Sequence, residues 1–151
     1  MADFRASAII ARPLTDVFDF AANLENAPKM TVNVVKMEKT TDGPIGVGSK
    51  FIETRNIRGK EAKAHIEITE FVPYQSYTIE SSANGLKLIY RYLFHEIEEG
   101  TQVEMEAHIK TTGIKMAITR PIIVKMIKND DGYQLNYLKK SMEEQEEKDG
   151  K

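Results

Sequence analysis

Apolar and polar residues alternate with a period of two in residues 3–11 and again through most of the stretch from 32 to 112. Because successive side chains of a strand point to opposite faces, this pattern predicts half-buried strands. We expect strands over residues 3–11, 32–40, 49–58, 62–72, 77–83, 88–94 and 103–109. Asn84-Gly85 and Glu99-Gly100 are typical of tight turns, so neighbouring strands should be antiparallel.

Helical periodicity appears on either side of this strand region. Pro13 suits the first turn of a helix, and the apolar spacing after it predicts a short helix over residues 14–22. Residues 23–30 predict a second short helix or turn. From Gly113 onward the spacing predicts one long C-terminal helix, which we expect Pro121 to kink and the sequence Asp130-Asp131-Gly132 to weaken.

These elements predict an α+β fold in which a curved antiparallel sheet of six or seven strands wraps around the long C-terminal helix. The sheet has one apolar face, and only this helix is large enough to cover it. With 151 residues, 41% hydrophobic and 29% charged, the chain should form one globular domain over residues 1–151. The charged end, from about residue 143 to 151, is expected to fray into solvent.

Composition excludes several classes of function. A net charge of −2 provides no basic face for nucleic acid. The absence of cysteine removes disulfides, thiolate chemistry and cysteine-ligated zinc. Residues 1–7 lack the pattern of a signal peptide, and no apolar run approaches the roughly 20 residues that span a bilayer. We therefore expect a cytoplasmic protein without an integral membrane segment.

The order of these elements, together with several short motifs, resembles the SRPBCC superfamily of START-related, birch-pollen-allergen-like helix-grip proteins. Within it, the chain is most similar to the polyketide cyclase/dehydrase-like branch. The resemblance covers nearly the whole chain and rests on five segments, which are residues 7–18, 43–51, 68–73, 100–103 and 135–140. It implies a cavity between the sheet and the C-terminal helix that takes lipids, polyketides or other apolar molecules. It implies no shared catalytic motif and no cofactor.

The glycine-rich stretch from Gly43 to Ser49 invites comparison with a phosphate-binding loop. A Walker loop places lysine directly after its last glycine and leads into a helix. Here Ser49 lies between Gly48 and Lys50, and a strand follows. A dinucleotide fingerprint also fails, because Phe51 stands where a third glycine belongs. We interpret the stretch as a structural turn and expect no cofactor.

The three histidines are the natural candidates for acid–base chemistry or metal binding. His65, His95 and His108 all have the strand parity opposite to the apolar residues, and no two of them have ligand-pair spacing. We expect surface histidines and no metal site.

Glu53 and Arg55 share their strand parity with Phe51 and Ile57. If this parity faces the cavity, a carboxylate and a guanidinium enter it, where they could pair or orient a polar ligand head. If the opposite parity faces inward, both charges are solvated, and the cost of burying charge favours this second orientation. Both residues are retained as candidate ligand contacts.

The remaining candidate contacts are apolar or aromatic. On the strands, Tyr77, Tyr90, Tyr92, Phe94 and Met105 occupy the predicted inner face, where core and pocket wall coincide. On the C-terminal helix the candidates are Ile114, Ile118, Ile122 and Met126.

Three functions remain open at this level. The first is binding or transport of an apolar or amphipathic small molecule in the cavity. The second is a cyclase, dehydratase or hydrolase that uses a carboxylate in the cavity, for which Glu53 is the candidate. The third is a protein-interaction module, which a large apolar surface patch would favour. The sequence does not determine whether the chain is a monomer or a homodimer.

Overall fold

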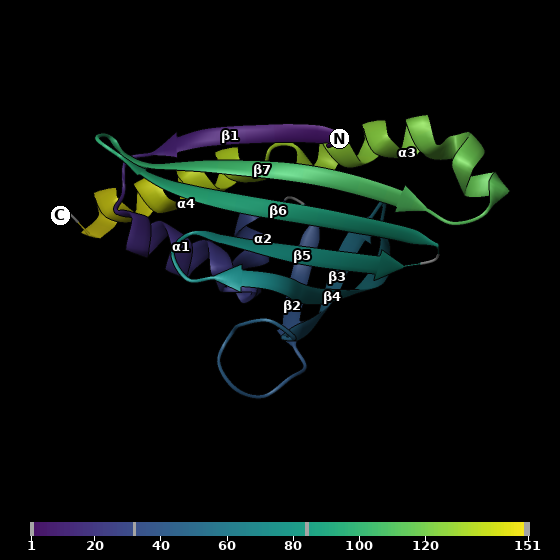
Figure 1. The fold of residues 1–151 in the computed structure, drawn as a ribbon, viewed down its shortest axis with the longest axis horizontal. Helices are drawn as coiled ribbons and strands as arrows, with labels where there is room; N and C mark the ends of the chain where they lie inside the picture. Colours follow the sequence, from purple (N-terminus) through teal and green to yellow (C-terminus); the bar gives the residue numbers. More distant parts are fainter. Residues whose placement is uncertain (1, 32, 84, 150–151) are drawn as a thin grey trace.

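The computed structural model describes residues 2–31, 33–83 and 85–149. Seven antiparallel strands form one curved sheet in the order β1-β7-β6-β5-β4-β3-β2 (Figure 1). The strands are β1 (Phe4–Ile10), β2 (Val34–Lys39), β3 (Lys50–Ile57), β4 (Lys60–Val72), β5 (Ser76–Ala83), β6 (Leu86–Ile97) and β7 (Gly100–Thr111). The predicted antiparallel sheet is confirmed, with Val32 of the expected second strand lying outside the described residues.

Strand alternation places the apolar side chains as the sequence predicts. On β7, Val103, Met105, Ala107 and Ile109 are all buried, and the residues between them are half-buried. The β5–β6 hairpin pairs Ala83 with Leu86. Its turn includes Gly85, which has a φ of 80° that glycine adopts without a steric penalty. Asn84 of the predicted Asn-Gly turn lies outside the described residues.

The short helices follow β1 as expected. Helix α1 (Leu14–Ala22) begins after Pro13 and buries Val17, Phe18 and Ala21, and the 3₁₀ helix η1 (Leu24–Asn26) and helix α2 (Ala27–Met30) continue the segment. The glycine-rich loop before β3 is a turn held by backbone contacts, as the Gly48 amide donates to the Ile68 carbonyl at 2.9 Å.

The C-terminal helical segment is divided in two, a finer detail than the single helix predicted. Helix α3 (Ile114–Asp131) and helix α4 (Gln134–Asp149) are separated by a turn at Gly132 and Tyr133. Aspartate and glycine are poor helix formers, which explains a break at this point. Helix α3 continues through Pro121; the expected kink there stays a prediction.

The two helices have different surroundings. Helix α4 lies against the concave side of the sheet and buries Leu135, Leu138 and Met142 (Figure 1). Helix α3 lies near the end of the sheet toward which β7 runs, and Asp131 is its one fully buried residue. Helix α4 extends to Asp149, so the expected fraying from residue 143 onward stays a prediction. Over residues 2–31, 33–83 and 85–149, no helix combines the length and hydropathy required to cross a membrane.

Candidate functional site

A pocket of about 350 Å³ lies between α3 and strands β3 to β6. Its sheet wall is built largely from small side chains, because Ala62 and Ala64 of β4 and Ala83 of β5 leave space that larger residues would fill. Its helix wall consists of Met116, Ile123, Met126 and Ile127 of α3. Both Ile57 and Met126 line the pocket and are about half exposed, so the pocket reaches the molecular surface at this rim.

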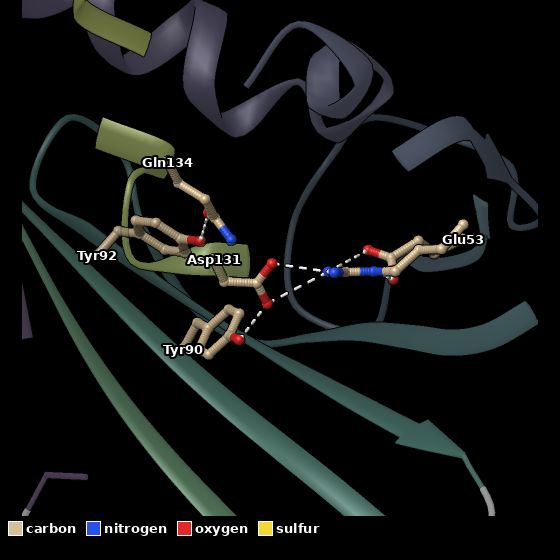
Figure 2. A network of polar contacts seen from close by, with 6 residues as sticks. Glu53, Tyr90, Tyr92, Asp131 and Gln134 are labelled. Atoms are coloured by element: carbon tan, nitrogen blue, oxygen red, sulfur yellow. Dashed lines mark hydrogen bonds and ion pairs between the residues drawn. The ribbon is translucent and has the colours of Figure 1, made fainter. Parts of the chain in front are cut away.

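The inner end of the pocket is a network of charged and polar side chains (Figure 2). The Arg55 guanidinium on β3 donates from Nε to Glu53 Oε1 at 2.6 Å and from Nη1 to Asp131 Oδ1 at 3.0 Å. The Tyr90 hydroxyl on β6 donates to Asp131 Oδ2. One cation thus lies between two carboxylates, and Asp131 fastens the end of α3 to the sheet.

A second, smaller space of about 40 Å³ lies beyond this network, toward α2. It is bordered by Tyr77, Tyr92 and Gln134, while Glu53 and Arg55 line both spaces. The Tyr92 hydroxyl donates to Gln134 Oε1 at 2.6 Å, and the Tyr77 hydroxyl donates to the Ala21 carbonyl at 3.1 Å. The charged network therefore forms the partition between a tight inner space and the larger pocket.

The protonation of this network follows from burial and neighbouring charge. Burial lowers the pKa of Arg55, but the Asp131 and Glu53 carboxylates outweigh it and raise the pKa above its usual range. Burial, reinforced by Asp131, raises the pKa of Tyr90 well above its ordinary value. Burial is also the main cause of the raised pKa of Tyr92 and of Tyr77. At neutral pH the site therefore contains a charged guanidinium and three neutral tyrosine hydroxyls.

The preferred expectation for Glu53 and Arg55 is wrong. Both side chains lie on the concave face and line the pocket, rather than facing solvent on the outer one. The cost of burying them is offset because each charge has an opposite partner at hydrogen-bond distance, and Asp131 supplies the additional partner that strand parity did not reveal. This orientation retains both residues as candidate ligand contacts.

The other sequence-predicted residues separate into four groups. Tyr77, Tyr90 and Tyr92 border the inner space, while Phe94 and Met105 are buried in the core and line neither pocket. Met126 lines the larger pocket. Ile114, Ile118 and Ile122 are exposed and lie outside both pockets, because the inner face of α3 is formed by Met116, Ile123 and Ile127 instead. For all of these residues, contact with a ligand stays a prediction.

Sequence analysis did not identify Asp131 or Gln134 as site residues, although Asp131 belongs to the predicted helix break and Gln134 follows it closely. The sequence of β4 did contain a signal for the position of the pocket, because its inward residues change from Ala62 and Ala64 to Ile66 and Ile68. Small side chains at one end of a strand mark the place where packing leaves space.

The histidines lie away from this site. His65 and His95 are exposed and His108 is half-buried, and His95 Nε2 lies 3.2 Å from Glu104 Oε2 on the outer face. Among the residues that the structure describes, no group of three or more histidine or acidic side chains could hold a metal ion.

A curved antiparallel sheet that packs on a C-terminal helix and borders a pocket is the helix-grip fold that the sequence predicts. The family described as polyketide cyclase / dehydrase and lipid transport matches residues 1–143. The chain therefore belongs to this family. No curated protein sequence matches the chain.

Solved structures show the same fold at low sequence identity. A protein from Thermus thermophilus is 19% identical with a TM-score of 0.73, and the match covers 90% of this chain and 93% of that one. A START superfamily protein from Mycobacterium smegmatis is 11% identical with a TM-score of 0.70, covering 93% and 97%. The di-domain ARO/CYC protein StfQ of the steffimycin biosynthetic pathway is 12% identical with a TM-score of 0.77, covering 94% of this chain and 50% of StfQ.

Proposed function

We propose that this protein binds or carries a neutral, largely apolar small molecule in the pocket between α3 and strands β3 to β6. The observation that carries the proposal is the pocket itself, whose volume of about 350 Å³ lies within the range of small-molecule sites. Apolar walls would provide the affinity and the charged network at the inner end would fix the orientation, as in other sites of this kind.

The charges of the lining favour a neutral ligand over an anionic one. Glu53, Asp130 and Asp131 contribute three carboxylates to the pocket wall, whereas Arg55 and Lys63 contribute two cations. Arg55 is already engaged by two carboxylates, so a ligand carboxylate would meet net negative charge. A hydroxyl group on the ligand can instead donate to a carboxylate oxygen. The small side chains on the sheet wall suit a flat ring, which fits an aromatic or polyketide-like molecule.

The test is a fluorescence titration with N-phenylnaphthylamine, a neutral apolar probe. Ala64→Phe fills the pocket from β4 and should weaken probe binding by about ten-fold or more, which corresponds to about 1.4 kcal/mol. The matched control is His65→Phe, which adds the same ring type one residue away on the exposed outer face and should leave binding within about two-fold. Equal losses in both variants, or no binding by the unmodified protein, would refute the proposal. Native mass spectrometry of the purified protein would then identify any retained ligand.

An enzymatic role for the same pocket is the second candidate, because Glu53 is buried and faces the ligand space. Against it, Arg55 donates to Oε1 of this carboxylate at 2.6 Å and lies within 3.5 Å of Oε2, so both oxygens are engaged. Incubating an identified ligand with the unmodified protein and with Glu53→Gln separates the two roles. An enzyme would convert the ligand and lose conversion in the variant, whereas a carrier would return it unchanged in both cases.

A further inference from the structure

Helix α3 exposes a stripe of large apolar side chains to solvent. Ile114, Ile118, Ile122 and Met126 are 81%, 74%, 65% and 51% exposed, and their four-residue spacing places them along one side of the helix. The opposite side of α3 carries Val124 and Ile127, which pack against the core. Apolar residues therefore occupy both sides of α3, and the outer stripe has no covering element among the described residues.

Positive charge accompanies this stripe. Residues 114–129 contain four cationic residues and no aspartate or glutamate, in a chain whose net charge is −2. Arg120 is one of the four and is paired with Asp3 at 2.6 Å. The other three, Lys115, Lys125 and Lys128, are exposed. Lys115 and Lys125 lie on the same side of the helix as the apolar stripe.

The rest of the molecule extends this charge distribution. Two further segments lie at the end of the sheet where α3 begins, namely the turn between β3 and β4 and the paired ends of β6 and β7. Both segments carry exposed basic residues, and the charge of exposed Glu61 offsets one of them. These basic residues are Arg58, Lys60, Lys87 and Lys110. The β6–β7 turn at the opposite end of the sheet carries exposed Glu96, Glu98 and Glu99 (Figure 1). The α3 end of the molecule is thus basic and apolar, and the far end is acidic.

We propose that α3 docks on the surface of an anionic lipid membrane. The surface of an anionic membrane complements both the apolar stripe and the positive charge of α3. The isoleucine side chains can be buried among the acyl chains, and the anionic headgroups attract the lysines. A symmetric pairing of two copies through α3 would instead bring like charges together. Docking would place the rim of the pocket at the membrane, because Met126 belongs both to the stripe and to the pocket wall. This inference goes beyond ligand binding in the pocket and can fail independently of it.

The test is co-sedimentation of the protein with phospholipid vesicles. The unmodified protein should bind mixed vesicles of phosphatidylcholine and phosphatidylglycerol, bind pure phosphatidylcholine much more weakly, and dissociate as salt is raised. The double variant I118E/I122E should lose binding, while its control Val47→Glu, which alters an exposed apolar residue of a loop, should not. Each lysine near an anionic surface strengthens binding by about five-fold, so neutralising the three exposed lysines of α3 together should weaken vesicle binding by on the order of 100-fold.

Several results would overturn the proposal. They are failure to bind anionic vesicles, equal binding to both vesicle types, or an equal loss with Val47→Glu. A dimer in solution that dissociates in I118E/I122E would show that a second copy covers the stripe instead. N-phenylnaphthylamine binding in the pocket should be unchanged in I118E/I122E, since both side chains lie outside the pocket, and this readout separates membrane docking from loss of fold.

Discussion

Replacing Asp131 with alanine should destabilise the protein more than the loss of any exposed ion pair would. The Asp131 side chain is 1% exposed and accepts hydrogen bonds from both Arg55 and Tyr90. Its removal leaves the half-buried Arg55 guanidinium with Glu53 as the remaining partner and leaves the Tyr90 hydroxyl without its acceptor.

Breaking a buried ion pair by removing one partner costs about 3–5 kcal/mol. Because Glu53 continues to neutralise Arg55, we expect the lower end, about 3 kcal/mol. For a domain of this length each kcal/mol shifts the Tm by about 2–4 °C, so the shift should be about 6–12 °C. Asp131→Asn retains an oxygen acceptor for Tyr90 but not the charge, and it should fall between the alanine variant and the unmodified protein.

Urea unfolding monitored by circular dichroism measures the difference in the free energy of unfolding. The control is Glu70→Ala, which breaks the exposed pair with Arg91 at 3.3 Å and should cost about 0–1 kcal/mol. If Asp131→Ala costs no more than Glu70→Ala, the network at the inner end of the pocket does not fasten α3 to the sheet. The same unfolding assay applies to the changes below.

Asp3→Asn should destabilise the protein at neutral pH. Burial opposes ionisation of Asp3, but the Arg120 guanidinium and the Ile109 amide outweigh it and lower the pKa of Asp3. The stability that ionised Asp3 contributes is therefore present above its ordinary pKa near 3.8 and is lost as the pH falls through the lowered pKa. A stability difference between Asp3→Asn and the unmodified protein that persists well below pH 3.8 would contradict this. Gly100→Ala should cost about 2–3 kcal/mol, because the added Cβ would lie 2.3 Å from a carbonyl oxygen of β1 at a φ of 140°. Gly46→Ala meets no atom within 4 Å, so equal losses in the two would refute the clash. Tyr77→Phe should cost about 1 kcal/mol through its lost hydrogen bond, and no change would mean that the hydroxyl is not needed.

The fold could be predicted because its signals are local. Alternation such as Val103, Met105, Ala107 and Ile109 reports directly which face of a strand is buried, and short turns require antiparallel neighbours. The order of the strands in space follows the order in the chain except at β1, which pairs with β7.

The site was harder to predict because its contacts join residues far apart in sequence. Arg55 can face inward beside Glu53 because Asp131 of α3 accepts a hydrogen bond from it. Asp131 lies 76 residues after Arg55 in the sequence, so no local sequence pattern reveals this contact. The exposed isoleucines of α3 were misleading for a related reason. Apolar residues occur on both sides of this helix, so periodicity did not identify the side that packs against the pocket.

The position of β1 has a consequence for the order of folding. Its residues from Phe4 to Ile10 pair with β7 residues 101 to 107, and the chain just after it is held by α4, where Arg12 Nη1 donates to the Met142 carbonyl at 3.0 Å. During synthesis, β1 leaves the ribosome well before β7 and has no partner in the sheet until β7 follows. Hairpins of consecutive strands can form earlier, since they require only short loops to close. Closure of β1 onto β7 should therefore be a late event, and hydrogen exchange during refolding should protect the β5–β6 hairpin before β1.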